Sequence, residues 1–439
     1  MLYLLYSLAL ALAMLLTLPY WLYQAARHGK YRRGFAERMG RIPVRLRPDT
    51  RPVIWVHAVS LGEVLAVGGL VGRMKAAFPQ HRVVVSTTTD TGQDLARKRF
   101  GAENVFYFPM DFAFAVRSYF RALRPEIVVL AETEFWPNFL RIAQASGART
   151  AVVNARISDR SLPRYLRYRW ALRRMLAHVD LFLAQTPEDA RRLQSIGAER
   201  QRIEVTGNLK FDVNEQTPPP IVEELRRTLA GDSARPVLVC GSTVEDEEAP
   251  LLKAFENIRV SHPRAVMFLA PRHPERFEAV ASLIREMGIP WHRRSQWDEE
   301  PLAGKVLLLD TIGELAGLYA LADVAFVGGS LVPRGGHNIL EPAQYGVAIV
   351  TGNYTDNFRD IVGMFQARDA VRIVGLAELP LALMHLLADD ADRQGLGRRA
   401  KETLQSQTGA TSRTLAALAA LAEREGKAKS TAVSTIGTD

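Results

Sequence analysis

A glutamate follows the first apolar run of the chain, at a position where it could accept a proton. Glu63 stands in the segment HAVSLGEV, after the apolar residues 53–56 and near the start of the helix expected next. The positive end of that helix is expected to keep the carboxylate ionised, as a general base requires at neutral pH. The structural alternative is an ordinary first-turn glutamate that only complements the helix dipole.

Further charged residues follow two later apolar runs of the first half. Glu132 and Glu134 lie in AETEFWPN after residues 127–130, and they would point to opposite sides of an extended chain. Acids at the end of a buried strand are costly unless they are paired or functional, which favours a functional role for one of them over simple helix capping. Lys210 in GNLKFD could place a cation at the same edge, although a lysine in a turn is usually only solvated.

The second half carries residues suited to phosphate. Arg272 in APRHPERF follows the apolar residues 266–269, and its planar guanidinium can donate hydrogen bonds in pairs. His273 beside it is expected to be structural. The run FVGGSLVPRGGHNILEPAQYG is rich in glycine before a helix, which predicts a phosphate cradle made of backbone N–H groups. Glu341, one turn into that helix, could accept both hydroxyls of a ribose.

Residues 310–314 (DTIGE) also follow an apolar run and open a helix, so their N–H groups could hold a base or a phosphate. The chain contains no Walker pattern and no dinucleotide fingerprint, which argues against an ATPase or a dehydrogenase.

Short apolar runs that alternate with helix-length segments must position these residues. This alternation is typical of parallel sheets covered by helices on both faces, and the Pro-rich residues 217–220 interrupt it. The sequence therefore predicts two doubly wound α/β domains, with ligands beyond the carboxyl ends of the strands. A long helical pattern is expected over about 391–425. The predicted division is an anchor helix over 1–26, domains over 27–216 and 222–425 joined by a linker at 217–221, and a disordered tail over 426–439.

The N-terminus reads as a membrane anchor. Residues 1–26 contain no charged side chain, and basic residues begin at Arg27. This order places the rest of the chain in the cytoplasm, with α-helical spanning favoured over a monotopic helix in the interface. The basic and aromatic stretch RSLPRYLRYRWALRR suits lipid headgroups, although it could also be a solvated helix face or bind single-stranded nucleic acid.

The composition narrows the classes of partner. The 439 residues carry 56 Lys and Arg against 47 Asp and Glu, a net charge of +9 that favours a polyanionic partner. The single cysteine, Cys240, excludes a disulfide framework and a Cys-based zinc site. The acidic runs 245–248 and 389–392 read as exposed helix starts, so no metal and no other cofactor is expected.

Five of these motifs, taken in order, resemble the 3-deoxy-D-manno-octulosonic acid (Kdo) transferases of lipid A assembly. They are HAVSLGE, AETEFWPN, GNLKFD, APRHPERF and GGHNILEPA. The resemblance extends from the anchor to the last long helix and implies the GT-B glycosyltransferase architecture, in which two Rossmann-like domains face a cleft.

The resemblance implies inverting transfer of Kdo from CMP-Kdo to the anionic lipid A precursor, lipid IVA, at the cytoplasmic face of the inner membrane, without nucleic acid. Glu63 would be the proton acceptor, and Glu134 and Lys210 would stabilise the transition state, with the relative roles of Glu132 and Glu134 left open. The residues implied for CMP are Pro271, Arg272, Ile312, Gly313, Glu314, Asn338, Ile339, Leu340 and Glu341, and those for acceptor or membrane docking are Arg164, Arg167, Tyr168 and Trp170.

Two alternatives remain at this point. Another sugar-nucleotide-dependent lipid glycosyltransferase or an epimerase of the same architecture would use a uridine diphosphate sugar. A membrane-tethered anion-binding protein would have no turnover at all.

Overall fold

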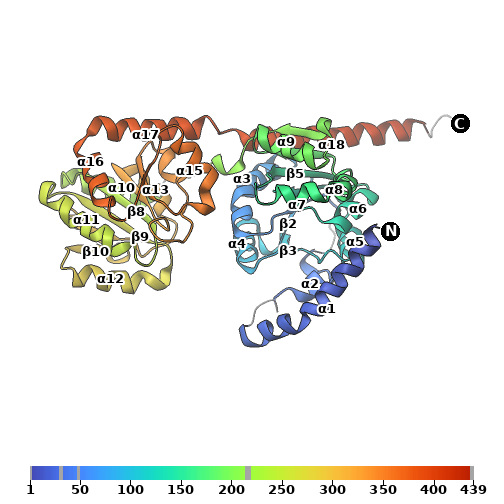
Figure 1. Cartoon of the computed structure of the whole chain (residues 1–439), viewed down its shortest axis with the longest axis horizontal. Helices are drawn as coiled ribbons and strands as arrows, with labels where there is room; N and C mark the ends of the chain where they lie inside the picture. Colours follow the sequence, from blue (N-terminus) through green and yellow to red (C-terminus); the bar gives the residue numbers. More distant parts are fainter. Residues whose placement is uncertain (1, 29–32, 47–49, 213–218, 436–439) are drawn as a thin grey trace. The chain divides into compact units, whose positions relative to one another are not determined.

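The chain folds into two compact units, each built around its own sheet. The computed structural model describes residues 2–28, 33–46, 50–212 and 219–435. Unit 1 comprises Met1–Asp212 and Thr408–Asp439, and unit 2 comprises Val213–Gln407 (Figure 1). Each unit contains a seven-stranded, wholly parallel sheet with helices packed on it, so the predicted pair of Rossmann-like α/β domains is confirmed.

Unit 1 is wound outwards from two central strands. Its strands are β1 (Val53–His57), β2 (Arg82–Thr87), β3 (Val105–Tyr107), β4 (Pro125–Ala131), β5 (Arg149–Ala155), β6 (Leu181–Ala184) and β7 (Ile203–Val205). Their order in the sheet is β3-β2-β1-β4-β5-β6-β7. The winding reverses between β1 and β4, and in open α/β sheets ligands bind where the winding reverses, beyond the carboxyl ends of the strands.

The helices of unit 1 connect these strands. They are α1 (Leu2–His28), α2 (Phe35–Arg38), η1 (Val44–Leu46), α3 (Leu61–Ala77), α4 (Asp90–Phe100), η2 (Ala102–Asn104), α5 (Ala113–Leu123), α6 (Pro137–Ala145), α7 (Leu162–Arg167), α8 (Arg169–Leu176), α9 (Pro187–Ile196), η3 (Arg200–Arg202), η4 (Leu209–Phe211) and α18 (Ala410–Thr435).

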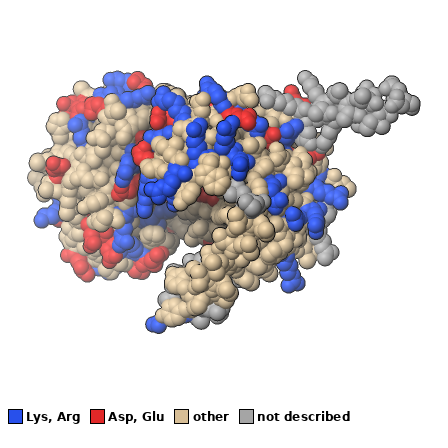
Figure 2. All heavy atoms as spheres, turned by 45° about the vertical axis from the view of Figure 1, so that its right-hand side comes forward, with Lys and Arg blue, Asp and Glu red and all other residues tan. Residues whose placement is uncertain are grey.

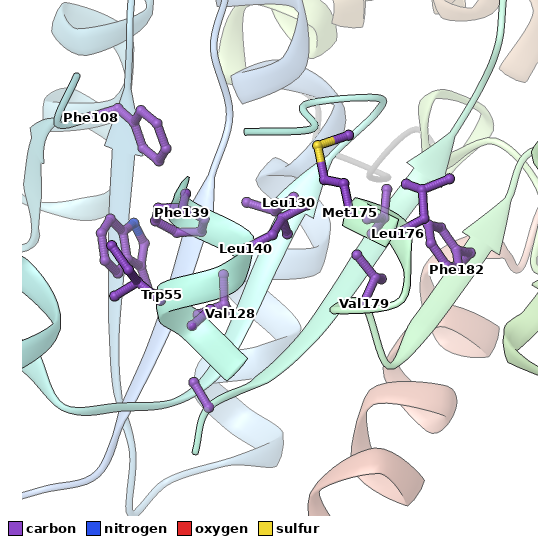
Figure 3. Close-up of a cluster of buried hydrophobic side chains, with 14 of the residues drawn as sticks. Trp55, Phe108, Val128, Leu130, Phe139, Leu140, Met175, Leu176, Val179 and Phe182 are labelled. Carbon is purple, nitrogen blue, oxygen red and sulfur yellow. The ribbon is translucent and has the colours of Figure 1, made fainter. Parts of the chain in front are cut away.

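Alternate residues of the buried strands fill two separate cores on the two faces of this sheet. On one face Trp55 of β1 packs edge-on against Phe139 of α6, with 5.0 Å between ring centroids. Figure 3 shows this core extending from Trp55 to Phe182. The indole N–H of Trp55 donates to the Ser86 hydroxyl, so the buried ring has a polar partner. The core thereby holds α6, which begins just after Glu134.

The core on the opposite face of the sheet includes the C-terminal helix α18, which the sequence assigned to the second domain. Leu418 and Leu421 of α18 pack there with residues of α3 and α4, and the Asp212 carboxylate accepts the Gly409 N–H at 2.6 Å. The chain therefore returns to unit 1 after Gln407, and the assignment of 408–425 to the second domain is wrong. Apolar residues at helical spacing on α18 complete a core that the sequence alone does not assign to either half.

The end of the chain also differs from the prediction. The expected helix over 391–425 is two helices, α17 (Asp390–Gln405) and α18, separated near Gly409 with its φ of 89°. The predicted disordered tail is helical as far as Thr435, where α18 ends. Residues 436–439 lie outside the described residues, as do residues 217 and 218 of the predicted linker. The linker residues Pro220 and Ile221 instead belong to the first turn of α10.

Unit 2 repeats the winding pattern. Its strands are β8 (Val237–Thr243), β9 (Val266–Pro271), β10 (Trp291–Arg293), β11 (Val306–Leu308), β12 (Val324–Val327), β13 (Ala348–Gly352) and β14 (Arg372–Val374), in the order β10-β11-β9-β8-β12-β13-β14. The winding reverses between β8 and β12. Its helices are α10 (Pro220–Gly231), α11 (Glu248–Ser261), η5 (Pro274–Arg276), α12 (Phe277–Glu286), η6 (Arg294–Gln296), α13 (Leu315–Leu318), η7 (Tyr319–Leu321), α14 (Leu340–Gln344), η8 (Asp356–Phe358), α15 (Arg359–Gln366), α16 (Leu379–Ala388) and α17.

The predicted apolar N-terminal helix is present as α1, and its segment Tyr3–Tyr20 is long and apolar enough to cross a membrane. Its first turns contact other elements of unit 1. The Tyr3 hydroxyl hydrogen-bonds His178 at 2.5 Å, and the Ser7 hydroxyl accepts an N–H of Asn138 at 3.0 Å. Leucines on the other faces of α1 are exposed, and Figure 2 shows the helix as a largely uncharged surface on unit 1.

Candidate active site

Glu63 lies at the start of α3, at the point where the winding of unit 1 reverses. Ser60 caps the helix by accepting the Glu63 N–H, and the Ser60 hydroxyl donates to the Glu63 carboxylate at 2.9 Å. The second carboxylate oxygen accepts the Val59 N–H at 2.8 Å. This reciprocal capping fixes both the helix start and the side chain. Glu63 therefore stabilises the start of α3, and it also lies at the edge of the sheet where a general base is expected.

Burial gives Glu63 an unusual proton affinity. The residue is only 9% exposed. Burial raises the pKa of Glu63 to about 7, with the Val59 N–H and Ser60 hydroxyl opposing the shift and the charges of Glu132 and Glu134 adding to it. Desolvation outweighs the hydrogen bonds from Val59 and Ser60, so the carboxylate binds a proton more tightly than a position at a helix terminus led us to expect. A pKa near the working pH suits a group that must first accept and then release a proton.

This pKa predicts the pH dependence of the activity. A base must be deprotonated, so kcat/KM for the acceptor should fall about tenfold for each pH unit below about 6 and level off above about 8. Initial rates between pH 5 and 9, in buffers of constant ionic strength, measure this profile. A rate that stays constant from pH 5 to 8 would contradict a base with this pKa.

Glu132 and Glu134 lie after β4, the strand next to β1. The segment is a turn rather than an extended chain, and Glu132 has a φ of 56°. The extended chain on which the expected opposite orientations depended is therefore absent, and both carboxylates act electrostatically on Glu63. The Trp136 indole N–H donates to Glu134 at 3.0 Å. Burial raises the pKa of Glu134, which the Trp136 hydrogen bond partly offsets.

Lys210 completes this group from η4, which packs against α3. Its ammonium lies 3.9 Å from the Glu132 carboxylate. Asn154 at the end of β5 holds η4 by accepting the Leu209 N–H at 3.0 Å, and its backbone has a φ of 54°. The structure thus brings the predicted Glu63, Glu134 and Lys210 together, with Glu132 as the closest acid to the lysine.

His57, in the same motif as Glu63, has no such role in this arrangement. Its ring is buried and stacks on Phe108 with 3.8 Å between centroids, and Nδ1 lies 3.1 Å from the Ser86 carbonyl oxygen. Burial lowers the pKa of His57 to about 3, so the ring is neutral at physiological pH.

In unit 2, Arg272 follows β9 and is exposed beside the end of the sheet. Its backbone N–H donates to the Thr243 carbonyl, which joins the ends of β9 and β8. Its guanidinium acts electrostatically on Glu341, whose pKa burial raises while Asn338 and Arg272 oppose the shift. The predicted phosphate ligand and the predicted ribose acceptor are therefore neighbours.

The other predicted nucleotide residues lie in loops at the same edge of this sheet. Pro271 ends β9, and Gly313 adopts a φ of 93° after β11, the neighbour of β9. Ile312 is 82% exposed, whereas the Glu314 carboxylate pairs with Arg294 at 3.0 Å. Glu314 is thus already held by a cation in this arrangement.

Asn338 orders the start of α14. Its side-chain oxygen accepts the Leu340 N–H at 3.1 Å, and its amide nitrogen donates to Glu341 at 3.3 Å. Ile339 and Leu340 have buried side chains, so only their backbone groups could meet a ligand.

The first part of the glycine-rich run, residues 328–331, differs from the predicted phosphate cradle. The N–H groups of Gly329, Ser330 and Leu331 donate to the carboxylate of Glu247 at 2.7, 2.9 and 2.8 Å. These groups therefore do not form the predicted phosphate cradle, because an internal carboxylate already satisfies them. Glu247 and Glu248 are buried, so their assignment to an exposed helix start is also wrong, while Asp389 does cap α17 as expected.

The basic and aromatic stretch forms α7 and α8 in unit 1, and His178, two residues after the end of α8, contacts Tyr3 in the first turn of α1. Tyr168 and Trp170 are 53% and 60% exposed. Arg164 and Arg167 lie in the last turn of α7. Figure 2 shows many Lys and Arg side chains on this face of unit 1, next to the uncharged surface of α1.

Among the described residues, no group of three His, Cys, Asp or Glu side chains could hold a metal ion. The sequence places Ser60 in the first motif, but its capping of α3, the contact of Asn154 with η4 and the hydrogen bonds of Glu247 to residues 329–331 were not predicted. The spacing S-x-x-E is a capping signature that could have identified Ser60. Nothing local marks Asn154 or Glu247, whose partners lie 55 and more than 80 residues away.

Known proteins resemble this chain over most of its length. Residues 33–213 match the family described as "3-Deoxy-D-manno-octulosonic-acid transferase (kdotransferase)". The chain is 37% identical to the 3-deoxy-D-manno-octulosonic acid transferase of Bordetella pertussis over 94% of this chain and 98% of that protein. It is also similar to a solved C-terminal CMP-Kdo binding domain of WaaA from Acinetobacter baumannii, at 34% identity over 42% of this chain and 97% of that one, with a TM-score of 0.40.

A solved putative UDP-N-acetylglucosamine 2-epimerase from Listeria monocytogenes has the same fold. It is 13% identical, with a TM-score of 0.56 over 85% of this chain and 98% of that one. This likeness concerns the fold alone. The family follows from the identity to the Bordetella transferase over nearly the whole chain and from the family match of residues 33–213. The chain belongs to the 3-deoxy-D-manno-octulosonic acid transferases, which are glycosyltransferases.

Proposed function

We propose that the protein transfers Kdo from CMP-Kdo to a hydroxyl of the anionic lipid A precursor, lipid IVA, at the cytoplasmic face of the inner membrane. The observation that carries this proposal is the group of Glu63, Glu132, Glu134 and Lys210 where the winding of unit 1 reverses, in a chain of the Kdo transferase family. The CMP donor and the lipid acceptor follow from the family resemblance of the motifs.

In the proposed step Glu63 accepts the proton of the acceptor hydroxyl. The hydroxyl oxygen forms a bond to the anomeric carbon of Kdo while the bond from that carbon to the phosphate oxygen breaks, so CMP leaves with the bonding electrons. A single in-line displacement inverts the configuration at that carbon. Positive charge that develops on the sugar favours nearby carboxylates such as Glu134.

Lys210 is suited to hold the carboxylate of the Kdo sugar. Its ammonium is 3.9 Å from Glu132, a longer separation than a direct hydrogen bond, and its side chain is 32% exposed. Arg272 in unit 2 is suited to the departing phosphate, so we propose a reaction that needs no metal ion or other cofactor. The ribose would be met by Glu341, and the base by the backbone of 312–314.

We further propose that α1 lies in the membrane interface rather than across the bilayer. Tyr3 and Ser7 in its first turns are tied to unit 1, and Arg38, beyond its end, donates to the Thr88 carbonyl of the same unit at 2.5 Å. A spanning helix would carry its first turn to the far side of the bilayer. The exposed Tyr168 and Trp170, with the arginines of α7, would then meet lipid headgroups beside it.

This topology predicts the fate of an epitope tag fused before Met1. In intact spheroplasts a protease added from outside should leave the tag uncut, and it should cut the tag once the membrane is broken. A periplasmic loop of a known membrane protein serves as the positive control. Cleavage of the tag in intact spheroplasts would instead show that α1 crosses the bilayer.

The donor is tested by nucleotide binding and release. The purified full chain should bind CMP and should release CMP from CMP-Kdo only when the lipid acceptor is present. A uridine diphosphate sugar should be neither bound nor consumed. Consumption of such a sugar with no use of CMP-Kdo would favour the epimerase or another glycosyltransferase over the proposed function.

A further inference from the structure

The carboxylate of Glu247 lies at the centre of unit 2, where its winding reverses. Glu247 precedes α11 in the segment that follows β8, and its side chain is fully buried. It stands at the N-cap position of α11, but its side chain makes no capping hydrogen bond to that helix. Its oxygens instead accept the N–H groups of Gly329, Ser330 and Leu331, which follow β12, and of Val244 in its own segment.

This carboxylate therefore joins the two loops at the ends of β8 and β12. Four backbone N–H groups at 2.7 to 3.0 Å surround one ion. A buried charge is tolerated only when it is satisfied in this way, and hydrogen bonds to an ionised acceptor are stronger than those between neutral groups. Asp246 just before it has a φ of 73°, in the left-handed region that residues other than glycine adopt infrequently.

The fixed loop continues directly to the proposed nucleotide residues. The Gly336 N–H donates to the Gly329 carbonyl at 2.7 Å, and His337 Nδ1 lies 2.8 Å from the Gly328 carbonyl oxygen. Asn338 and Glu341 follow at once. Glycine is required at position 328, where the loop approaches Glu247. A Cβ there would lie 2.6 Å from the Ser242 carbonyl oxygen and 2.8 Å from the Glu247 carboxylate.

We infer that Glu247 is a positioning residue for the donor nucleotide: its buried carboxylate holds the loop 328–331 in the course that brings Asn338 and Glu341 to the nucleotide. The loop's N–H groups serve this internal ion, so the donor phosphate must be met by other groups such as Arg272. This inference deepens the proposed function and rests on it, since it assumes that CMP binds at this end of the unit 2 sheet.

The test compares Glu247→Gln with Glu248→Gln in the full chain. Glutamine keeps the shape but turns one acceptor into a donor that faces backbone N–H groups. Glu248 is a matched control because it is the next residue and is also buried, yet it bonds Thr243 and Arg276 rather than the loop. Calorimetry with CMP and steady-state kinetics with CMP-Kdo and the lipid acceptor supply the readouts.

Glu247→Gln should weaken CMP binding and raise the KM for CMP-Kdo about tenfold or more, and leave the KM for the lipid acceptor unchanged. Glu248→Gln should lower the melting temperature but keep the Kd for CMP within about twofold. A merely structural role would lower stability without this separation of the two KM values. Folded Glu247→Gln protein that binds CMP as tightly as the wild type would overturn the inference.

A second variant keeps the test open if Glu247→Gln does not fold. Gly328→Ala disturbs the contact between the loop and Glu247 from the loop side and leaves the carboxylate in place. This variant should also bind CMP more weakly than the wild type. Wild-type affinity for CMP would count against the positioning role of Glu247. Wild-type protein that fails to bind CMP would refute the proposed donor site itself, which separates that failure from a failure of the positioning role.

Discussion

Replacing Glu63 by glutamine is expected to lower kcat by roughly 10²- to 10⁴-fold, the range that general base catalysis contributes. Glutamine cannot accept the proton of the acceptor hydroxyl, but it can still accept the Val59 N–H that the carboxylate accepts at 2.8 Å. The nucleotide site is built from other residues, so the Kd for CMP should not change. Single-turnover rates of CMP release and calorimetry with CMP measure the two quantities.

Asp189→Asn is the matched control for this change. Asp189 occupies the same local motif at the start of α9, where its N–H is capped by Thr186, and it is 7% exposed. Loss of this carboxylate should cost stability and leave turnover per folded molecule close to that of the wild type. If Glu63→Gln retained wild-type turnover, the proton would have to leave by another route, and Glu63 would have only its capping role.

Replacing Arg272 by alanine is expected to lower kcat/KM for CMP-Kdo by roughly 100-fold, which corresponds to the loss of charge-assisted hydrogen bonds to phosphate. The side chain is exposed, so the melting temperature should change little. Arg272→Lys keeps the charge without the planar fork and should give an intermediate loss. Steady-state kinetics with varied CMP-Kdo at saturating acceptor provide the measurement.

Arg226→Ala controls for the loss of one positive charge from unit 2. Arg226 lies on α10, and its ion pair with Glu223 is 3.7 Å long and exposed, so little should depend on it. Equal kinetics for Arg226→Ala, Arg272→Ala and the wild type would remove Arg272 from the donor site.

The strands were largely predictable because parallel sheets are buried on both faces. Runs such as Leu181–Ala184 and Val324–Val327 are apolar throughout, and the structure has strands with these same bounds. Two edge strands gave no such signal. β7 exposes Glu204 and Val205, and β10 has the sequence WHR with no buried side chain.

What the sequence could not provide depends on partners far along the chain. The placement of α18 on unit 1 follows from a core shared with α3, which no local pattern reports. The glycine-rich sequence of residues 328–331 suggested a phosphate cradle. Nothing in that sequence shows that the N–H groups of the loop donate to Glu247, which lies some 80 residues earlier in the chain. Local pattern identified Glu63 as a first-turn carboxylate, but only the surrounding burial determines its pKa.

Mass analysis of the lipid after incubation with purified protein and CMP-Kdo tests the central claim most directly. We expect lipid IVA to gain the mass of one or more Kdo residues, with one CMP released for each addition. At an early time point, while the wild type is still in its initial-rate phase, the Glu63→Gln variant should give at most about a hundredth of the wild-type product. Unchanged lipid in the presence of folded protein that binds CMP would contradict Kdo transfer to this acceptor.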